Sequence, residues 1–146
     1  MNLVSDIMAS KGSAVVTVDR SAMVLDAIRK MVSEGIGALI VTDGDAIHGI
    51  FTERDYLRRI ALEGRTSKTT PVGEVATERL IVVEPSNTLE DCMALMTSER
   101  VRHLPVLDKG SLSGIVSVGD IVKHMSKQQA AEIRYLTDYI TGKYPG

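Results

Sequence analysis

The feature that most constrains this chain is an internal duplication. When the sequence is shifted by 65 positions, residues 14–55 align with residues 79–120 without a gap, and twelve of the aligned pairs are identical. One of these pairs is Asp55 with Asp120. Self-similarity at a fixed offset is a sign of repeated architecture. Two copies predict a paired domain with pseudo-two-fold symmetry, with clefts where the copies meet.

Both copies follow the same predicted order of elements, β-α-β-β-α. Runs of β-branched residues predict strands, apolar residues at helical spacing predict helices, and glycines between apolar runs predict hairpin turns. In the two copies in turn, the predicted strands cover 14–18 and 80–83, 38–42 and 103–107, and 46–52 and 111–117, and the first helices cover 24–34 and 89–99. Ser21 and Ser86 are the predicted helix caps, and a second helix starts after Thr52 and after Ser117.

The fold class that follows is mixed α/β (α+β), with two packed repeats. One copy has an apolar sheet face that it cannot cover alone, so packing the two sheets together buries both faces. We predict repeat 1 over residues 1–61, a linker over 62–71, repeat 2 over 72–126 and a helical tail over 127–146. The tail continues the last helix to Thr141, with an apolar stripe at Ile133, Leu136 and Ile140.

The composition argues against several classes of protein. The formal net charge is −2, so no overall field favours binding to nucleic acid or to an anionic membrane, and the apolar runs are too short to span a bilayer. The single cysteine, Cys92, excludes an internal disulfide and a cysteine-based metal cluster, and it favours the cytoplasm. We find no nucleophile elbow, zinc-ligand spacing or Walker loop, so we predict neither an enzyme nor a metal site.

One short motif occurs in both copies at the junction of a strand and a helix. It pairs Thr52 with Asp55 in the first copy and Ser117 with Asp120 in the second. A helix N-terminus attracts phosphate, and an ionised aspartate can accept charge-assisted hydrogen bonds from ribose hydroxyls. The same spacing is also a helix-capping signature. The residues alone therefore leave two interpretations open, a helix cap and a site for a ribose phosphate.

The surroundings of this motif resemble a known family. Residues 49–55 (GIFTERD) and 114–120 (GIVSVGD), together with residues 101–106 (VRHLPV), are similar to the tandem cystathionine β-synthase (CBS) domain pair, or Bateman module. The resemblance covers Val4 to Ser126. The first copy departs from it at Ile40, where the second copy has a proline.

The resemblance implies that an adenosine nucleotide binds in clefts between the copies, with AMP favoured and ADP, ATP, NAD(H) or S-adenosylmethionine as alternatives. Ribose and phosphate would meet one copy and the base would meet the other. In the Asp120 cleft it implies Ser117, Asp120, Arg102 and His103 for ribose and phosphate, and Val16, Ile36, Gly37 and Ala38 for the base. In the Asp55 cleft it implies Thr52, Asp55 and the cation Arg54 for ribose and phosphate, and Ile81, Val101, Arg102 and His103 for the base.

The two implied clefts differ in their cations. Arg54 aligns with Gly119, and the pair Gly37 and Ala38 aligns with Arg102 and His103. Few cations line either cleft, which favours a monophosphate ligand. The resemblance further implies a homodimer and a separate regulated protein as partners. The alternative is an interaction module whose clefts are empty, although the aspartate kept in both copies argues against it.

Overall fold

The computed structural model describes residues 2–12 and 15–140, and for residues 132–140 it describes the backbone only. The first part of the chain forms α1 (Val4–Lys11), β1 (Thr17–Asp19), α2 (Val24–Glu34), β2 (Ala38–Asp43), β3 (Ala46–Thr52), α3 (Glu53–Asp55) and the π-helical segment η1 (Tyr56–Ala61). The second part forms the 3₁₀ turn η2 (Val72–Glu74), α4 (Leu89–Glu99), β4 (His103–Asp108), β5 (Ser111–Ser117) and α5 (Val118–Ile140). The mixed α/β class is confirmed, and the helix α1 is an element that the sequence patterns did not predict.

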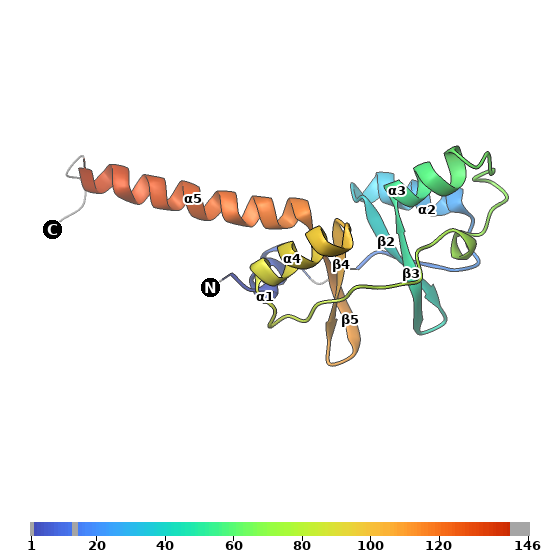
Figure 1. The fold of residues 1–146 in the computed structure, drawn as a ribbon, viewed down its shortest axis with the longest axis horizontal. Coiled ribbons are helices and arrows are strands. Elements are labelled where there is room, and N and C mark those ends of the chain that lie inside the picture. The colour runs from blue at the N-terminus through green and yellow to red at the C-terminus, as the bar shows by residue number, and fades with distance from the viewer. Residues whose placement is uncertain (1, 13–14, 141–146) are drawn as a thin grey trace.

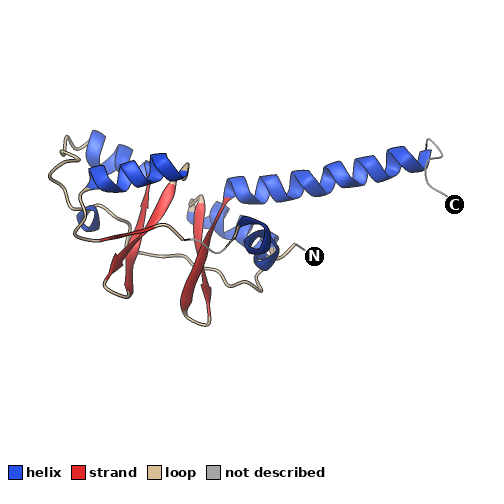
Figure 2. Cartoon of the chain, turned by 180° about the vertical axis from the view of Figure 1, so that it is seen from behind, coloured by secondary structure: helices blue, strands red, loops and turns tan. Residues whose placement is uncertain are grey.

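The two hairpins have the same local geometry. In the first copy β2 pairs antiparallel with β3, and in the second copy β4 pairs antiparallel with β5 (Figure 2). Each hairpin has one register shift, between Val41 and Thr42 and between Val106 and Leu107, and these positions align in the duplication. The duplication therefore extends to a β-bulge, an irregularity that bends the strand at one place in both copies.

The copies differ in their first strand. In the first copy β1 pairs parallel with β2 over Thr17–Asp19, so the strand starts later than the predicted residue 14, which lies outside the described residues. The predicted strand over 80–83 is wrong, because only Val83 forms a parallel bridge, with Val106. The N–H of Ile40 donates to the carbonyl of Val16, 3.3 Å away. Pro105 occupies the position of Ile40 and has no N–H, so this ladder hydrogen bond cannot form in the second copy.

Each copy contributes its leading segment to the core of the other. From α1, Val4 and Ile7 are buried in a core cluster with Leu89, Leu104 and Ile121 of the second copy. The corresponding segment before the second copy behaves in the same way. Its buried residues Val72, Val75 and Ala76 belong to the cluster that holds Val24, Leu39 and Phe51 of the first copy. The two copies therefore share their cores, and the segment that leads into each one is positioned by its partner.

The two hairpins lie side by side and pack against each other (Figure 1). Ala38, Ile40 and Ile50 are buried at this contact, and Leu112 and Ile115 of β5 pack against them. This small third cluster joins the copies along the facing sides of the two hairpins. It also sets the distance between the start of β2 and the end of β5, where the predicted site residues lie.

The second helices of the two copies have different lengths. After Thr52 the chain forms only α3 and η1, whereas after Ser117 it forms α5, which extends away from the body of the molecule (Figure 1). The predicted continuation of the tail as a helix is confirmed as far as Ile140. The stripe of Ile133, Leu136 and Ile140 lies outside the residues with described side chains, and Thr141 lies outside the described residues. Within residues 2–12 and 15–140, no helix has both the length and the apolar character needed to cross a bilayer.

The predicted helix caps Ser21 and Ser86 are wrong. The helix α4 is capped by Thr88, whose side chain accepts a hydrogen bond from the N–H of Asp91 while the carboxylate of Asp91 accepts one from the N–H of Thr88. The helix α2 starts after Met23 without a side-chain cap. Ser21 instead bonds to Asp19, because the turn after β1 places its hydroxyl and N–H over that carboxylate.

Candidate functional site

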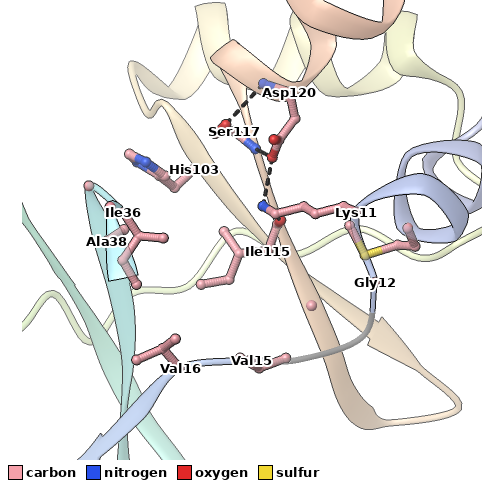
Figure 3. Close-up of a pocket in the computed structure, with 14 residues that line it drawn as sticks. Lys11, Gly12, Val15, Val16, Ile36, Ala38, His103, Ile115, Ser117 and Asp120 are labelled. Atoms are coloured by element: carbon pink, nitrogen blue, oxygen red, sulfur yellow. Dashed lines mark hydrogen bonds and ion pairs between the residues drawn. The ribbon is translucent and has the colours of Figure 1, made fainter. Parts of the chain in front are cut away.

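A cleft of about 260 Å³ lies between the two copies (Figure 3). One side is formed by the residues before and at the start of β2, and the other by β5, the start of α5 and the end of α1, which contacts β5 (Figure 3). Its lining residues are Met8, Lys11, Gly12, Val15, Val16, Gly35, Ile36, Gly37, Ala38, His103, Gly114, Ile115, Ser117 and Asp120. Residues far apart in the sequence thus meet at one place, as the duplication predicted.

The polar end of the cleft is built around Asp120. Its Oδ2 accepts hydrogen bonds from the N–H of Ser117 at 2.9 Å and from Nζ of Lys11 at 2.8 Å. The N–H of Asp120 donates to Oγ of Ser117 at 3.1 Å, so the predicted cap is present. Burial on its own raises the pKa of Asp120, but the hydrogen bonds from Lys11 and Ser117 and the charge of Lys11 hold it below the ordinary value of 3.8. Asp120 is therefore an ionised acceptor at neutral pH.

His103 lies beside this end of the cleft, at the start of β4 (Figure 3). Burial is the main cause that lowers its pKa below 6.5, and the charges of Lys11 and Arg102 lower it further. The carboxylates of Glu53 and Asp120 act in the opposite direction but do not reverse the shift. His103 is therefore mainly neutral at neutral pH, and Lys11 is the charged cation among the lining residues.

The other end of the cleft is apolar. Val15, Val16, Ile36, Ala38 and Ile115 line it, and Ala38 is buried. A flat apolar ring fits such a surface, since small-molecule sites are mostly lined by apolar side chains with a few polar groups that set orientation.

The structure brings together most of the residues predicted for this cleft. Seven of them, Val16, Ile36, Gly37, Ala38, His103, Ser117 and Asp120, are among its lining residues. Arg102 is not, and its side chain is exposed on the strand entry where its carbonyl accepts the N–H of Val118 at 3.0 Å. The role in ligand binding of the residues predicted for this cleft stays a prediction.

Of the lining residues that the sequence did not predict, Lys11 is the charged one. It is the last residue of α1, and its Nζ also donates to the carbonyl of Ile115 at 2.8 Å. No motif marks it, because it lies outside the aligned repeat and more than a hundred residues from Asp120 in sequence. It reaches the cleft only because α1 packs in the core of the second copy.

The equivalent site around Asp55 is differently arranged. Its Oδ2 accepts the N–H and the hydroxyl of Thr52, at 3.0 and 3.1 Å, and its Oδ1 accepts the hydroxyl of Thr77 at 2.9 Å. Thr77 is held there by two backbone hydrogen bonds with Ile50, of 2.9 and 2.8 Å. Both oxygens of Asp55 are therefore bonded within the protein.

The remaining residues predicted for the Asp55 cleft are dispersed. The guanidinium of Arg54 donates to the carbonyl of Arg100 at 3.5 Å. Ile81 and Val101 pack against the core of the second copy. His103 lines the Asp120 cleft instead. The two sites that looked alike in sequence thus differ in which oxygens of their aspartates are hydrogen-bonded within the protein.

Among the described residues, no group of three or more His, Cys, Asp or Glu side chains is arranged to hold a metal ion. The one cysteine, Cys92, is buried, and burial raises the pKa of its thiol.

Comparison with known proteins identifies the family. The CBS domain model matches twice, over residues 4–62 and 72–127. The chain belongs to the CBS domain family. Its two copies are CBS domains, and the CBS pair accounts for the duplication, the shared cores and the cleft between the copies.

Individual CBS proteins are similar over most of the chain. The mitochondrial CBS domain-containing protein CBSX3 of Arabidopsis thaliana is 40% identical, over 97% of this chain and 73% of its own length. A solved structure from Burkholderia ambifaria, described as a candidate signal-transduction protein with CBS domains, is 49% identical, with a TM-score of 0.82 over 85% of this chain and 93% of that one. Hypoxic Response Protein I, solved with two coordinated zinc ions, is 29% identical, with a TM-score of 0.69 over 85% and 99% of the chains.

Proposed function

We propose that this CBS pair is a regulatory module that senses an adenosine nucleotide in the Asp120 cleft and has no catalytic role. The observation that carries the proposal is the polarity of the cleft. Asp120, Ser117 and Lys11 lie at one end, and apolar side chains form the other. A nucleoside phosphate has the same division, with a polar sugar phosphate and a flat base. The Burkholderia relative supports a role in signalling.

Size and charge favour AMP among the adenosine nucleotides. The cleft volume of about 260 Å³ is just below the ~300–1,000 Å³ of most small-molecule sites, so it suits a mononucleotide better than NAD(H). With His103 mainly neutral, Lys11 is the charged cation of the lining, which suits a monophosphate better than a triphosphate. ADP, ATP and S-adenosylmethionine are the alternatives. No step of this proposal needs a metal ion.

Isothermal titration calorimetry with AMP, ADP, ATP, NAD, NADH and S-adenosylmethionine tests this function. We expect AMP to bind with a sub-millimolar Kd and more tightly than ATP or NAD. The matched variants are Asp120→Ala and Asp55→Ala, which remove the same side chain and the same helix cap in the two copies. If none of these ligands binds at sub-millimolar concentration, the nucleotide-sensing role is wrong, and the CBS pair is better explained as an interaction module with empty clefts.

We also propose that the protein forms a homodimer through the helices that end each CBS domain. Leu57 of η1 and Val122 of α5 align in the duplication, and their exposed fractions are 58% and 57%. A pair of equivalent exposed aliphatic side chains suits a symmetric contact with a second copy. Sedimentation velocity at micromolar concentration is expected to give a dimer, and the double variant Leu57→Asp, Val122→Asp a monomer. A wild-type monomer would overturn this assembly.

The signal would pass from this dimer to a separate regulated protein. We place the protein in the cytoplasm, because the buried Cys92 thiol is free and calls for no oxidising compartment.

A further inference from the structure

The most informative contact outside the predicted motif joins α1 to the candidate site. Nζ of Lys11 lies 2.8 Å from Oδ2 of Asp120 and 2.8 Å from the carbonyl oxygen of Ile115 (Figure 3). An ammonium group has three donors, so these two contacts leave one that can turn to the cleft. Lys11 therefore occupies the side of the carboxylate that a sugar hydroxyl would also approach.

The position of Lys11 is set by the fold. Val4 and Ile7 anchor α1 in the core of the second CBS domain, and Met8 packs directly over Gly114, where any larger residue would meet its sulfur. The helix ends at Lys11, and Gly12 follows with a φ of 89°, a conformation that favours glycine. The backbone of Lys11 is thus fixed, while its four-carbon side chain can change rotamer.

The contact itself can be exchanged. The side chains of Lys11 and Asp120 are 39% and 23% exposed, and partly exposed ion pairs contribute little net stability. The hydrogen bonds from Lys11 and from the N–H of Ser117 are both to Oδ2, and within the described residues Oδ1 of Asp120 accepts no hydrogen bond. A ligand can therefore bind one oxygen before Lys11 leaves the other.

We propose that Lys11 determines phosphate specificity by exchanging partners. Without ligand its ammonium neutralises Asp120. When a nucleoside monophosphate binds, Asp120 accepts the ribose hydroxyls and the ammonium of Lys11 moves to the phosphate. The ion pair discriminates against a ligand without phosphate, because such a ligand displaces Lys11 and gives it no new anion. This inference rests on the proposed nucleotide-sensing function and adds the residue that reads the phosphate.

The test is the ratio of AMP affinity to adenosine affinity, measured by calorimetry on the full chain. Lys11→Met keeps the length of the side chain and removes its charge. We expect AMP to bind about ten-fold more weakly, as for one lost charge-assisted contact, and adenosine to bind at least as tightly as in the wild type. The ratio then falls ten-fold or more. Lys11→Arg keeps the charge and is expected to retain most of the wild-type ratio.

Lys30 supplies a matched control. It also donates to a backbone carbonyl, that of Thr17, and it does not line the cleft. Lys30→Met is expected to leave the ratio unchanged. Suppose that the wild type binds AMP, and that Lys11→Met either lowers the affinities for AMP and adenosine equally or changes neither. The role of Lys11 is then overturned, while the nucleotide-sensing function stands. If the wild type binds neither ligand, both proposals fall. Melting temperatures of all variants within a few degrees of the wild type establish that they fold.

Discussion

The two aspartates of the duplicated motif have different surroundings although their local sequences align. Asp55 is bonded through both oxygens, to Thr52 and to Thr77, and Thr77 is fixed by its backbone pairing with Ile50. Asp120 is bonded through one oxygen, and its long-range partner is the flexible side chain of Lys11. The partner of Asp55 is a short side chain on a backbone held by hydrogen bonds, and the partner of Asp120 is a long side chain that can change rotamer. The segment that leads into each CBS domain therefore supplies the long-range partner of the aspartate in the other copy, Thr77 for Asp55 and Lys11 for Asp120.

The largest expected effect is the difference between removing the two aspartates. Asp120→Ala should weaken AMP binding by about ten- to a hundred-fold, which corresponds to ~1.5–3 kcal/mol for hydrogen bonds to a charged group. Asp55→Ala should change the AMP affinity by less than about three-fold, because AMP is expected to bind in the Asp120 cleft. Calorimetry measures both. Equal losses in the two variants would show that the clefts are equivalent in solution.

A second prediction concerns the site around Asp55. Thr77→Ala removes the hydroxyl that bonds to Oδ1 of Asp55. The wild type is expected to bind one AMP per chain. Thr77→Ala is expected to bind a second AMP about ten-fold more weakly, since no lysine among the residues with described side chains bonds to Asp55 as Lys11 does to Asp120. The stoichiometry from calorimetry decides this. The control Thr77→Ser keeps the hydroxyl and should still bind one AMP per chain. If Thr77→Ala also binds only one AMP, the hydroxyl of Thr77 is not what prevents binding at Asp55.

A third prediction concerns the N-terminal cap of α4 in the second CBS domain. Thr88→Ala removes the side-chain cap of α4 and should lower the free energy of unfolding by about 1 kcal/mol. Ser86→Ala, at the cap position that the sequence pattern favoured, should leave it within about 0.5 kcal/mol. Urea denaturation measures both variants. A larger loss at Ser86 than at Thr88 would contradict the observed capping geometry.

The smallest expected effect is the pH dependence that His103 contributes, a residue with no histidine counterpart in the first CBS domain. His103 aligns with Ala38, and its pKa in the folded protein lies below 6.5. As pH falls through about 6.5, the unfolded chain takes up a proton before the folded one does, so the free energy of unfolding decreases. Wild type and His103→Gln should therefore differ by a constant amount above pH 7.5, and the wild type should lose stability relative to the variant below pH 7. Denaturant unfolding at a series of pH values checks the sign.

Local sequence patterns predicted the elements that form through local interactions, namely helices and tight turns. The helical spacing at 24–34 and 89–99 coincides with α2 and α4, and the glycines between apolar runs coincide with the two hairpin turns. The strand over 80–83 failed because, of these residues, only Val83 bridges the neighbouring strand, and that strand contains Pro105. Strand formation depends on the partner strand, so composition alone was insufficient.

The sequence by itself determined the duplication, the family, and the residues of the repeated motif, because these are properties of spacing and residue type. Only the tertiary structure decided which long-range partner each aspartate has. Lys11 and Thr77 lie outside or at the edge of the recognisable motif, and they reach Asp120 and Asp55 because each leading segment packs in the core or against the strands of the opposite CBS domain. Contacts between residues this far apart depend on how the two copies exchange those segments, and the aligned repeats carry no signal for that exchange.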